Sequence, residues 1–335
     1  MRDKVLKRLS LESLMDLKVD YAFKQLFGIE KNKDITVVFL NAILQRTGRE
    51  RIKDISFTNT EAGGEYVDDK QSRLDLLVVT DANEWINIEI QFTNQYDMVK
   101  RSIYYWSGVY RAPMQKKMTY KKLNPVISIN ILNFNLFAQT DQFHTTYHLY
   151  EDVEKFKLTD VMEFHFIEMP KLISDWKDNK LDPWDDVLAR WLLLLGIVDH
   201  RNKTIYEDIY KELEEIAMKD KTLNAAFKNW EEISSTQEQV LAYETRLKRV
   251  LDEEAAHREA ILREKEAKQI GEQIGEKRGK KIGEEIGEKR GKEIGEEIGE
   301  KRGKEAVARQ LLEKGMNIET ISEITGLEKD RINEI

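Results

Sequence analysis

The sequence has no cysteine and only five histidines among its 335 residues. The absence of cysteine excludes a disulfide scaffold, thiol catalysis, an iron–sulfur cluster and any cysteine-ligated zinc. The two histidines closest together, His144 and His148, flank a Thr-Thr-Tyr segment that favours a strand over a helix, which argues against a zinc pair. Thiol chemistry and histidine–zinc chemistry are therefore set aside.

Long hydrophobic runs are also missing. The longest spans eight residues, 191–198, whereas a membrane-spanning helix needs about 20, and the N-terminus has no signal-peptide core. We therefore expect a soluble, cytoplasmic protein that does not partner a membrane. With 41% apolar residues, the chain can bury a core of about 150 to 240 residues and still carry an appended region.

Acidic residues are absent from one long segment, although the whole chain carries a net charge of −8. Residues 98–140 contain no Asp or Glu, seven Lys and Arg, among them Lys116 and Lys117, and five interleaved Tyr and Trp. The net charge disfavours a nucleic-acid partner, but this basic, aromatic segment indicates a phosphate-binding face. Alternatively, the lysines are solvated loop charges and the aromatic residues belong to the core.

The order of the predicted elements indicates an α/β core with a mixed sheet. Apolar periodicity predicts helices at 14–27, 35–44 and 98–111, and short β-branched or aromatic runs predict strands at 52–58, 73–79, 85–92, 125–134, 145–150 and 163–169. Helices are expected throughout 184–268. We therefore expect a core (1–180), a helical extension (181–268), a glycine-repeat segment (269–304) and a small helical C-terminal module (305–335).

Glycine recurs at every fourth position from Gly271 to Gly303, within a near-copied twelve-residue unit that begins at Ile274 and again at Ile286. At about 1 kcal/mol per glycine relative to alanine, the nine glycines cost an isolated helix about 9 kcal/mol. Each Glu–Lys pair four residues apart returns only about 0.3 to 0.5 kcal/mol. The segment is thus either a helix that forms by self-association, with glycine faces packed closely, or a flexible charged spacer.

The last segment, 305–335, shows a compact three-helix pattern with a turn at 325–327 that resembles a helix-turn-helix. Its seven acidic and four basic residues give a net charge of −3, which disfavours contact with DNA phosphates. We therefore expect this module to contact protein. The region from about residue 245 onward is expected to self-associate and to modulate the core.

Two carboxylates are predicted to face each other across a hairpin. If the strands on either side of residues 80–84 pair antiparallel, Asp75 lies opposite Glu89 and Arg73 opposite Gln91, all on one side of the sheet. Like charges so placed are destabilising by a few tenths to about 1 kcal/mol. A divalent cation would relieve this repulsion. Alternatively, Arg73 neutralises the pair in a purely structural cluster.

Several short stretches carry a family resemblance. They are Asp20-Tyr-Ala-Phe-Lys24-Gln-Leu-Phe27, Arg73-Leu-Asp75-Leu-Leu-Val, Asn87-Ile-Glu89-Ile-Gln91, and Arg101 with Tyr105. In combination, over roughly residues 10 to 240, they resemble the Rpn family of recombination-promoting nucleases, also described as transposases, of the PD-(D/E)XK nuclease superfamily. The glycine-repeat tail and terminal module also resemble that family's C-terminal region. The resemblance implies a restriction-endonuclease-like core.

The resemblance further implies a metal-dependent DNA endonuclease, a hydrolase without a small-molecule cofactor. By this resemblance Asp75, Glu89 and the backbone carbonyl of Ile90 hold Mg²⁺, or another divalent cation such as Mn²⁺ or Ca²⁺, and Asp20 completes the cluster. Gln91 stands at the superfamily's lysine position and positions the attacking water, because an amide cannot act as a base. The residues expected to contact DNA are Lys24, Arg73, Arg101 and Tyr105, together with Lys116 and Lys117 of the basic segment.

Two other functions stay open at the level of the sequence. The first alternative is a catalytically weak DNA-binding or recombination accessory protein, in which the carboxylate cluster is structural. The second is an oligomerising regulator controlled by its C-terminal tail. The nuclease interpretation places the protein in DNA recombination or phage defence.

Overall fold

The computed structural model describes residues 9–58, 61–62, 72–93 and 97–335. The chain divides into two compact units, Met1–His257 and Arg258–Ile335. Among the described residues, no helix combines the length and the apolar character needed to cross a membrane.

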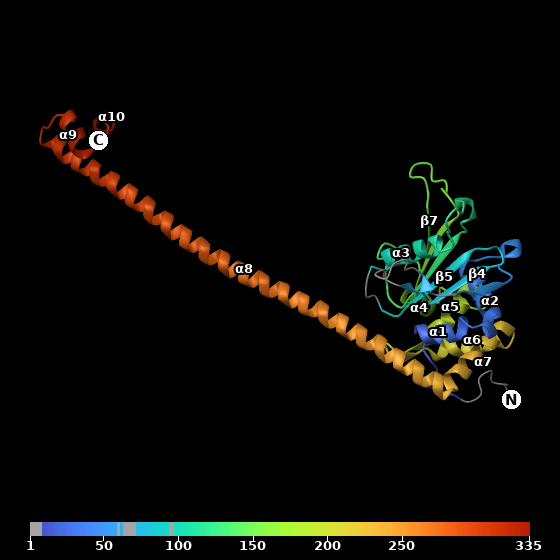
Figure 1. Cartoon of the computed structure of the whole chain (residues 1–335). Coiled ribbons are helices and arrows are strands. Elements are labelled where there is room, and N and C mark those ends of the chain that lie inside the picture. The colour runs from blue at the N-terminus through green and yellow to red at the C-terminus, as the bar shows by residue number, and fades with distance from the viewer. Residues whose placement is uncertain (1–8, 59–60, 63–71, 94–96) are drawn as a thin grey trace. The chain divides into compact units, whose positions relative to one another are not determined.

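The first unit is built on a six-stranded mixed sheet in the order β1-β4-β5-β6-β8-β7 (Figure 1). Strands β5, β6 and β8 are parallel, while β1, β4 and β7 run antiparallel to their neighbours. The mixed α/β class predicted from the sequence is confirmed. The strands of the sheet are β1 (Ile55–Phe57), β4 (Leu76–Thr80), β5 (Trp85–Gln91), β6 (Val126–Leu132), β7 (His144–His148) and β8 (Met162–Glu168).

Two short ribbons lie outside the main sheet: β2 (Glu61–Ala62) pairs with β3 (Ser72–Arg73), and β9 (Val198–Asp199) pairs with β10 (Thr204–Ile205). The β9–β10 ribbon interrupts the stretch that the sequence predicts to be wholly helical. The expected pairing of Arg73 with Gln91 is wrong, since Arg73 pairs with Glu61. The physical reason is a bend at Asp75, which directs the preceding residues out of the sheet.

Helices cover both faces of the sheet (Figure 1). The larger core lies between one face and a helical layer whose centre is Trp191, with ring centroids 6.4 Å from Phe27 and 6.3 Å from Phe39. On the other face α3 buries Trp106 and Val109 in a second core. The helices of this unit are α1 (Asp20–Phe27), α2 (Lys33–Ile43), α3 (Met98–Arg111), α4 (Met169–Lys177), α5 (Val187–Gly196), α6 (Glu207–Ala217), α7 (Lys221–Ser235) and the start of α8 (Gln237–Glu313).

The second unit consists of the rest of α8, α9 (Ile318–Thr325) and α10 (Lys329–Asn333). The glycine repeat is helical along its whole length as part of α8. The three helices meet at Ala308, Ile321 and Ile332, as the three-helix pattern predicts. Gly326 ends α9 with a φ of 69°, a left-handed conformation that glycine adopts at little cost.

Candidate active site

Helix α1 brings an acid and a base to the start of β4. Asp20 lies in the first turn of α1, where the helix dipole favours a negative charge. Lys24 follows one turn later, and its Nζ lies 4.0 Å from Asp20 Oδ2 and 2.9 Å from Asp75 Oδ1. Phe23 and Phe27 are fully buried on the same helix and fix its orientation.

Asp75 and Glu89 form the cross-strand pair that the sequence predicts. The pairing of Leu76 with Ile88 sets the predicted register of β4 against β5. The Asp75 backbone N–H donates to Glu89 Oε1 at 3.3 Å, and the Ile90 N–H donates to Asp75 Oδ2 at 3.0 Å. The two residues are only 9% and 1% exposed, so water screens their charges poorly.

This burial changes the proton affinity of both carboxylates. Loss of hydration raises the pKa of Asp75, an effect that Lys24 opposes and the Asp20 charge reinforces. Burial, together with the Asp75 charge, raises the pKa of Glu89 well above its ordinary range, while Arg101 opposes the shift. The pair therefore holds negative charge that its surroundings compensate incompletely.

Helix α3 places Arg101 and Tyr105 beside this pair. Arg101 donates from NH1 to Gln91 Oε1 at 2.8 Å and from Nε to the Tyr105 hydroxyl at 3.1 Å. Its NH2 lies 3.5 Å from Glu89 Oε2, to which Gln91 Nε2 also donates at 3.4 Å. Arg101 thus holds the Gln91 amide next to the carboxylates.

The start of α8 contributes residues that sequence reasoning missed. Arg246 Nε donates to Asp20 Oδ1 at 2.7 Å. Two pockets of about 230 and 770 Å³ share Asp20, Asp75, Arg246 and Arg249 in their walls. The signal in the sequence was the group of bases Arg246, Lys248 and Arg249, in a stretch interpreted as a helical extension and as the start of the self-associating region.

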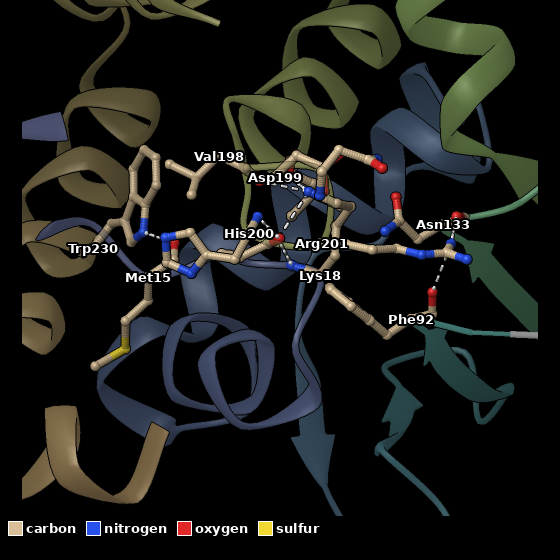
Figure 2. Close-up of polar contacts among 12 residues, drawn as sticks. Met15, Lys18, Phe92, Asn133, Val198, Asp199, His200, Arg201 and Trp230 are labelled. Atoms are coloured by element: carbon tan, nitrogen blue, oxygen red, sulfur yellow. Dashed lines mark hydrogen bonds and ion pairs between the residues drawn. The ribbon is translucent and has the colours of Figure 1, made fainter. Parts of the chain in front are cut away.

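A polar network, shown in part in Figure 2, includes Lys18 and Phe92 of the smaller pocket. Lys18 lines this pocket, is almost fully buried, and donates from Nζ to the Val198 carbonyl at 2.5 Å. Arg201 donates from NH1 to the carbonyls of Asn133 at 2.9 Å and Phe92 at 3.4 Å (Figure 2). The β9–β10 ribbon is thereby fastened to the ends of β5 and β6.

Some residues proposed from the sequence lie apart from this cluster. Lys116 and Lys117 are exposed in a turn that follows α3, and neither lines the two pockets. The side chain of Arg73 falls outside the described residues. Of the expected DNA-contacting side chains, Lys24, Arg101 and Tyr105 therefore adjoin the carboxylates.

The donor set at this site is chemically suited to a hard divalent cation. Within the described ranges, no group of three or more His, Asp or Glu side chains could hold a metal, and Asp20 is engaged by Arg246. Asp75 and Glu89 nevertheless supply two adjacent carboxylates, and Mg²⁺ is usually held by one or two carboxylates, with water or phosphate completing its shell. Their raised pKa values fit a site whose negative charge a cation would stabilise.

Comparison with protein families gives two matches. Residues 17–260 match the PD-(D/E)XK nuclease family transposase model, and residues 302–335 match the C-terminal HTH domain of the Rpn/YhgA-like nuclease family. A search of curated proteins and a search of solved structures returned no match.

The second match confirms the helix-turn-helix that the turn at 325–327 suggested. Such domains bind DNA as a class, so the match favours DNA over the protein partner that the module's charge indicated. The first match covers well over half of the chain, from α1 to the start of α8, and includes Asp75, Glu89 and Arg246. The chain therefore belongs to the PD-(D/E)XK nuclease family transposases, and it carries the C-terminal helix-turn-helix domain of Rpn/YhgA-like nucleases.

Proposed function

We propose that this protein is a DNA endonuclease that depends on a divalent metal ion. The observation that carries the proposal is the buried Asp75–Glu89 pair within the family-matched region, of which Asp75 lines both pockets. Family membership gives the nuclease class, and the incompletely compensated charge of the pair supports a metal requirement.

In the proposed site Asp75, Glu89 and the backbone carbonyl of Ile90 hold Mg²⁺ or a similar cation such as Mn²⁺ or Ca²⁺. When bound, such an ion polarises a phosphate and lowers the pKa of a water molecule. Gln91, held by its hydrogen bond to Arg101, orients the attacking water but cannot take its proton. Asp20, which shares Lys24 with Asp75, would complete the cluster directly or through a bound water.

Positive side chains around the pair would bind the DNA backbone. Lys24 and Arg101 contact the carboxylates directly, and they can turn to a phosphate once a cation neutralises the pair. We assign Tyr105 and Arg73 to flanking phosphates from the family resemblance, and Lys116 and Lys117 because exposed bases follow the DNA backbone without reading sequence. The helix-turn-helix domain supplies a separate DNA contact.

The biological role that fits this chemistry is DNA recombination or phage defence. We also propose that the region from residue 245 onward self-associates. The support is a set of large apolar side chains that α8 exposes at repeat-spaced positions: Ile270, Ile274, Ile282, Ile286, Ile294 and Ile298.

The test is cleavage of supercoiled plasmid by the full chain with Mg²⁺ or with EDTA. We expect nicked and linear products only with the metal, and a loss of at least ~100-fold in rate for Asp75→Asn and Glu89→Gln, because even outer-shell changes cost metal sites about 10- to 100-fold. Asp152→Asn, an exposed acid remote from both pockets, is the control. Metal-independent cleavage, or full activity in both variants, would contradict the proposal.

A second candidate function is a DNA-binding accessory protein in which the cluster is structural. It is favoured by Lys24 and Arg101, which lie 2.9 Å and 3.5 Å from the two carboxylates and already offset part of their charge. The plasmid assay separates the two candidates, since an accessory protein binds the plasmid but leaves it intact.

A further inference from the structure

Helix α8 carries two arginines into the walls of the nuclease site. Arg246 and Arg249 both line the two pockets that flank Asp20 and Asp75. Arg246 is about one-third exposed and Arg249 more than two-thirds. Both therefore lie within reach of a molecule that enters these pockets.

Helix α8 is also held by contacts that involve neither arginine. The Tyr243 hydroxyl accepts a hydrogen bond from the Asp16 backbone N–H at 2.9 Å and lies 2.6 Å from His200 Nδ1. Farther along the helix, Glu254 accepts from Arg201 NH2 at 2.5 Å. These two anchors hold the helix before and after the arginines, so the pair with Asp20 is not the only contact that positions this part of α8.

The geometry of Arg246 suits an oxyanion. Asp20 engages the Nε atom, not the NH1–NH2 fork with which arginine binds phosphate bidentately. The carboxylates of the site repel a phosphate, and Lys24 and Arg101 are directed at Asp75 and Glu89. A cation that faces the pockets from α8, as Arg246 and Arg249 do, would offset this repulsion.

We propose that Arg246 binds a backbone phosphate of DNA in the nuclease site, and that Arg249 binds the next phosphate along the same strand. Asp20 holds Arg246 in place until the phosphate arrives. This inference rests on the proposed function, because it takes DNA as the molecule that enters the pockets.

The test measures DNA binding by the full chain in EDTA, so that cleavage plays no part. Fluorescence anisotropy of a labelled duplex over a series of salt concentrations gives Kd and its salt dependence. For Arg246→Ala we expect about a tenfold rise in Kd, in line with loss of one charge-assisted hydrogen bond. The slope of log K against log salt should flatten by about 0.9 for each lost phosphate contact. Arg246→Lys should restore the slope but only part of the affinity.

The matched control is Arg263→Ala. Arg263 is an exposed arginine of α8 that pairs with Glu259 four residues away, as Arg249 pairs with Glu253, and it lines neither pocket. Its removal should leave Kd and slope unchanged. If Arg246→Ala with Arg249→Ala lowers the melting temperature but leaves the slope at the wild-type value, the pair with Asp20 is structural and the inference is wrong.

The binding experiment and the plasmid assay can fail independently of each other. If the wild type does not cut plasmid with Mg²⁺ but Arg246→Ala weakens salt-dependent DNA binding, the phosphate site is supported and the proposed nuclease function is wrong. If the wild type cuts DNA, and the variant without Arg246 and Arg249 binds DNA as well as the wild type does, the nuclease function is supported and the phosphate site is wrong.

Discussion

Glu89 is a carboxylate with almost no contact with solvent, and this isolation has a measurable effect on stability. Because its pKa in the folded chain is raised, the folded state binds a proton more tightly than the unfolded state does. The free energy of unfolding therefore falls as pH rises from the ordinary carboxyl range, about 4.3, through the raised pKa. Above the ordinary carboxyl range, the burial of Glu89 therefore destabilises the metal-free protein.

Glu89→Gln should stabilise the protein in EDTA at neutral pH. The glutamine can still accept from the Asp75 N–H, and Arg101 keeps Gln91 and Tyr105 as partners. Removing the cross-strand repulsion should gain a few tenths to about 1 kcal/mol, roughly 1 to 4 °C in melting temperature for a core of this size. A melting temperature far below that of the wild type would mean that the ionised pair is needed for structure.

Metal binding should depend on pH in the same range. A cation binds the ionised carboxylates, so protons compete with it until the pH exceeds the raised pKa of Glu89. We expect Mn²⁺ affinity, measured by titration calorimetry, to rise by up to about tenfold per pH unit below that pKa, and to be weaker and less pH-dependent in Glu89→Gln. An affinity that is constant over this range in the wild type would argue against the carboxylate pair as the metal site.

The sequence predicts local pairings at this site better than distant ones. In β5 the residues Ile86, Ile88 and Ile90 alternate with Asn87, Glu89 and Gln91, and the short loop at 80–84 sets the register, so the Asp75–Glu89 pairing follows from the sequence. Arg246 lies 226 residues from Asp20, and no local periodicity encodes a contact at that separation. The bend at Asp75 was missed for a related reason, since it accompanies the pairing of Arg73 with Glu61 outside the main sheet, which no local pattern encodes.

At the scale of single elements, α8 is the exception to the usual amphipathic helix. At the glycines from Gly271 to Gly303, a side chain would meet nothing within 4 Å in the described structure, so these residues are not needed for packing within one chain. The exposed isoleucines of the repeat stand next to them in the sequence. A second helix would cover both, with close backbone approach at the glycines.

A fragment of residues 245–335 should therefore gain helicity with concentration. Circular dichroism and sedimentation should show a helical species larger than a monomer, because the glycines cost an isolated helix about 1 kcal/mol each unless contacts between chains offset them. Replacing Ile282, Ile286 and Ile294 by Gln should weaken the association. If the fragment is an unfolded monomer at all concentrations, the prediction of self-association is wrong and the segment acts only as a flexible linker.

At the scale of the whole molecule, each of the two units has its own proposed role. All residues assigned to the nuclease site, Arg246 and Arg249 included, lie in the first unit, and the helix-turn-helix domain lies in the second. The family match ends at residue 260, close to the boundary between the units. Cleavage chemistry and the second DNA contact should therefore be separable.

A chain that ends at His257 should keep its Mg²⁺-dependent cleavage rate at saturating DNA but require more DNA to reach it, because the helix-turn-helix contact is lost. A chain that ends at Thr236 should lose both rate and stability, since the Tyr243 and Glu254 anchors go with α8. Steady-state kinetics and thermal melting of the two truncations test this. Inactivity of the longer truncation at any DNA concentration would show that the tail takes part in the chemistry.

The exposure of α8 has a consequence for amide hydrogen exchange. Every residue from 258 to 303 is exposed, so the helical hydrogen bonds there are protected only while the helix itself persists, and a helix rich in glycine opens often. Amides of this stretch in a single chain should exchange with heavy water far sooner than those of the buried helix α5. When another helix covers the stretch, the same amides should become slow, and their exchange rate then reports how much of the protein is assembled at a given moment.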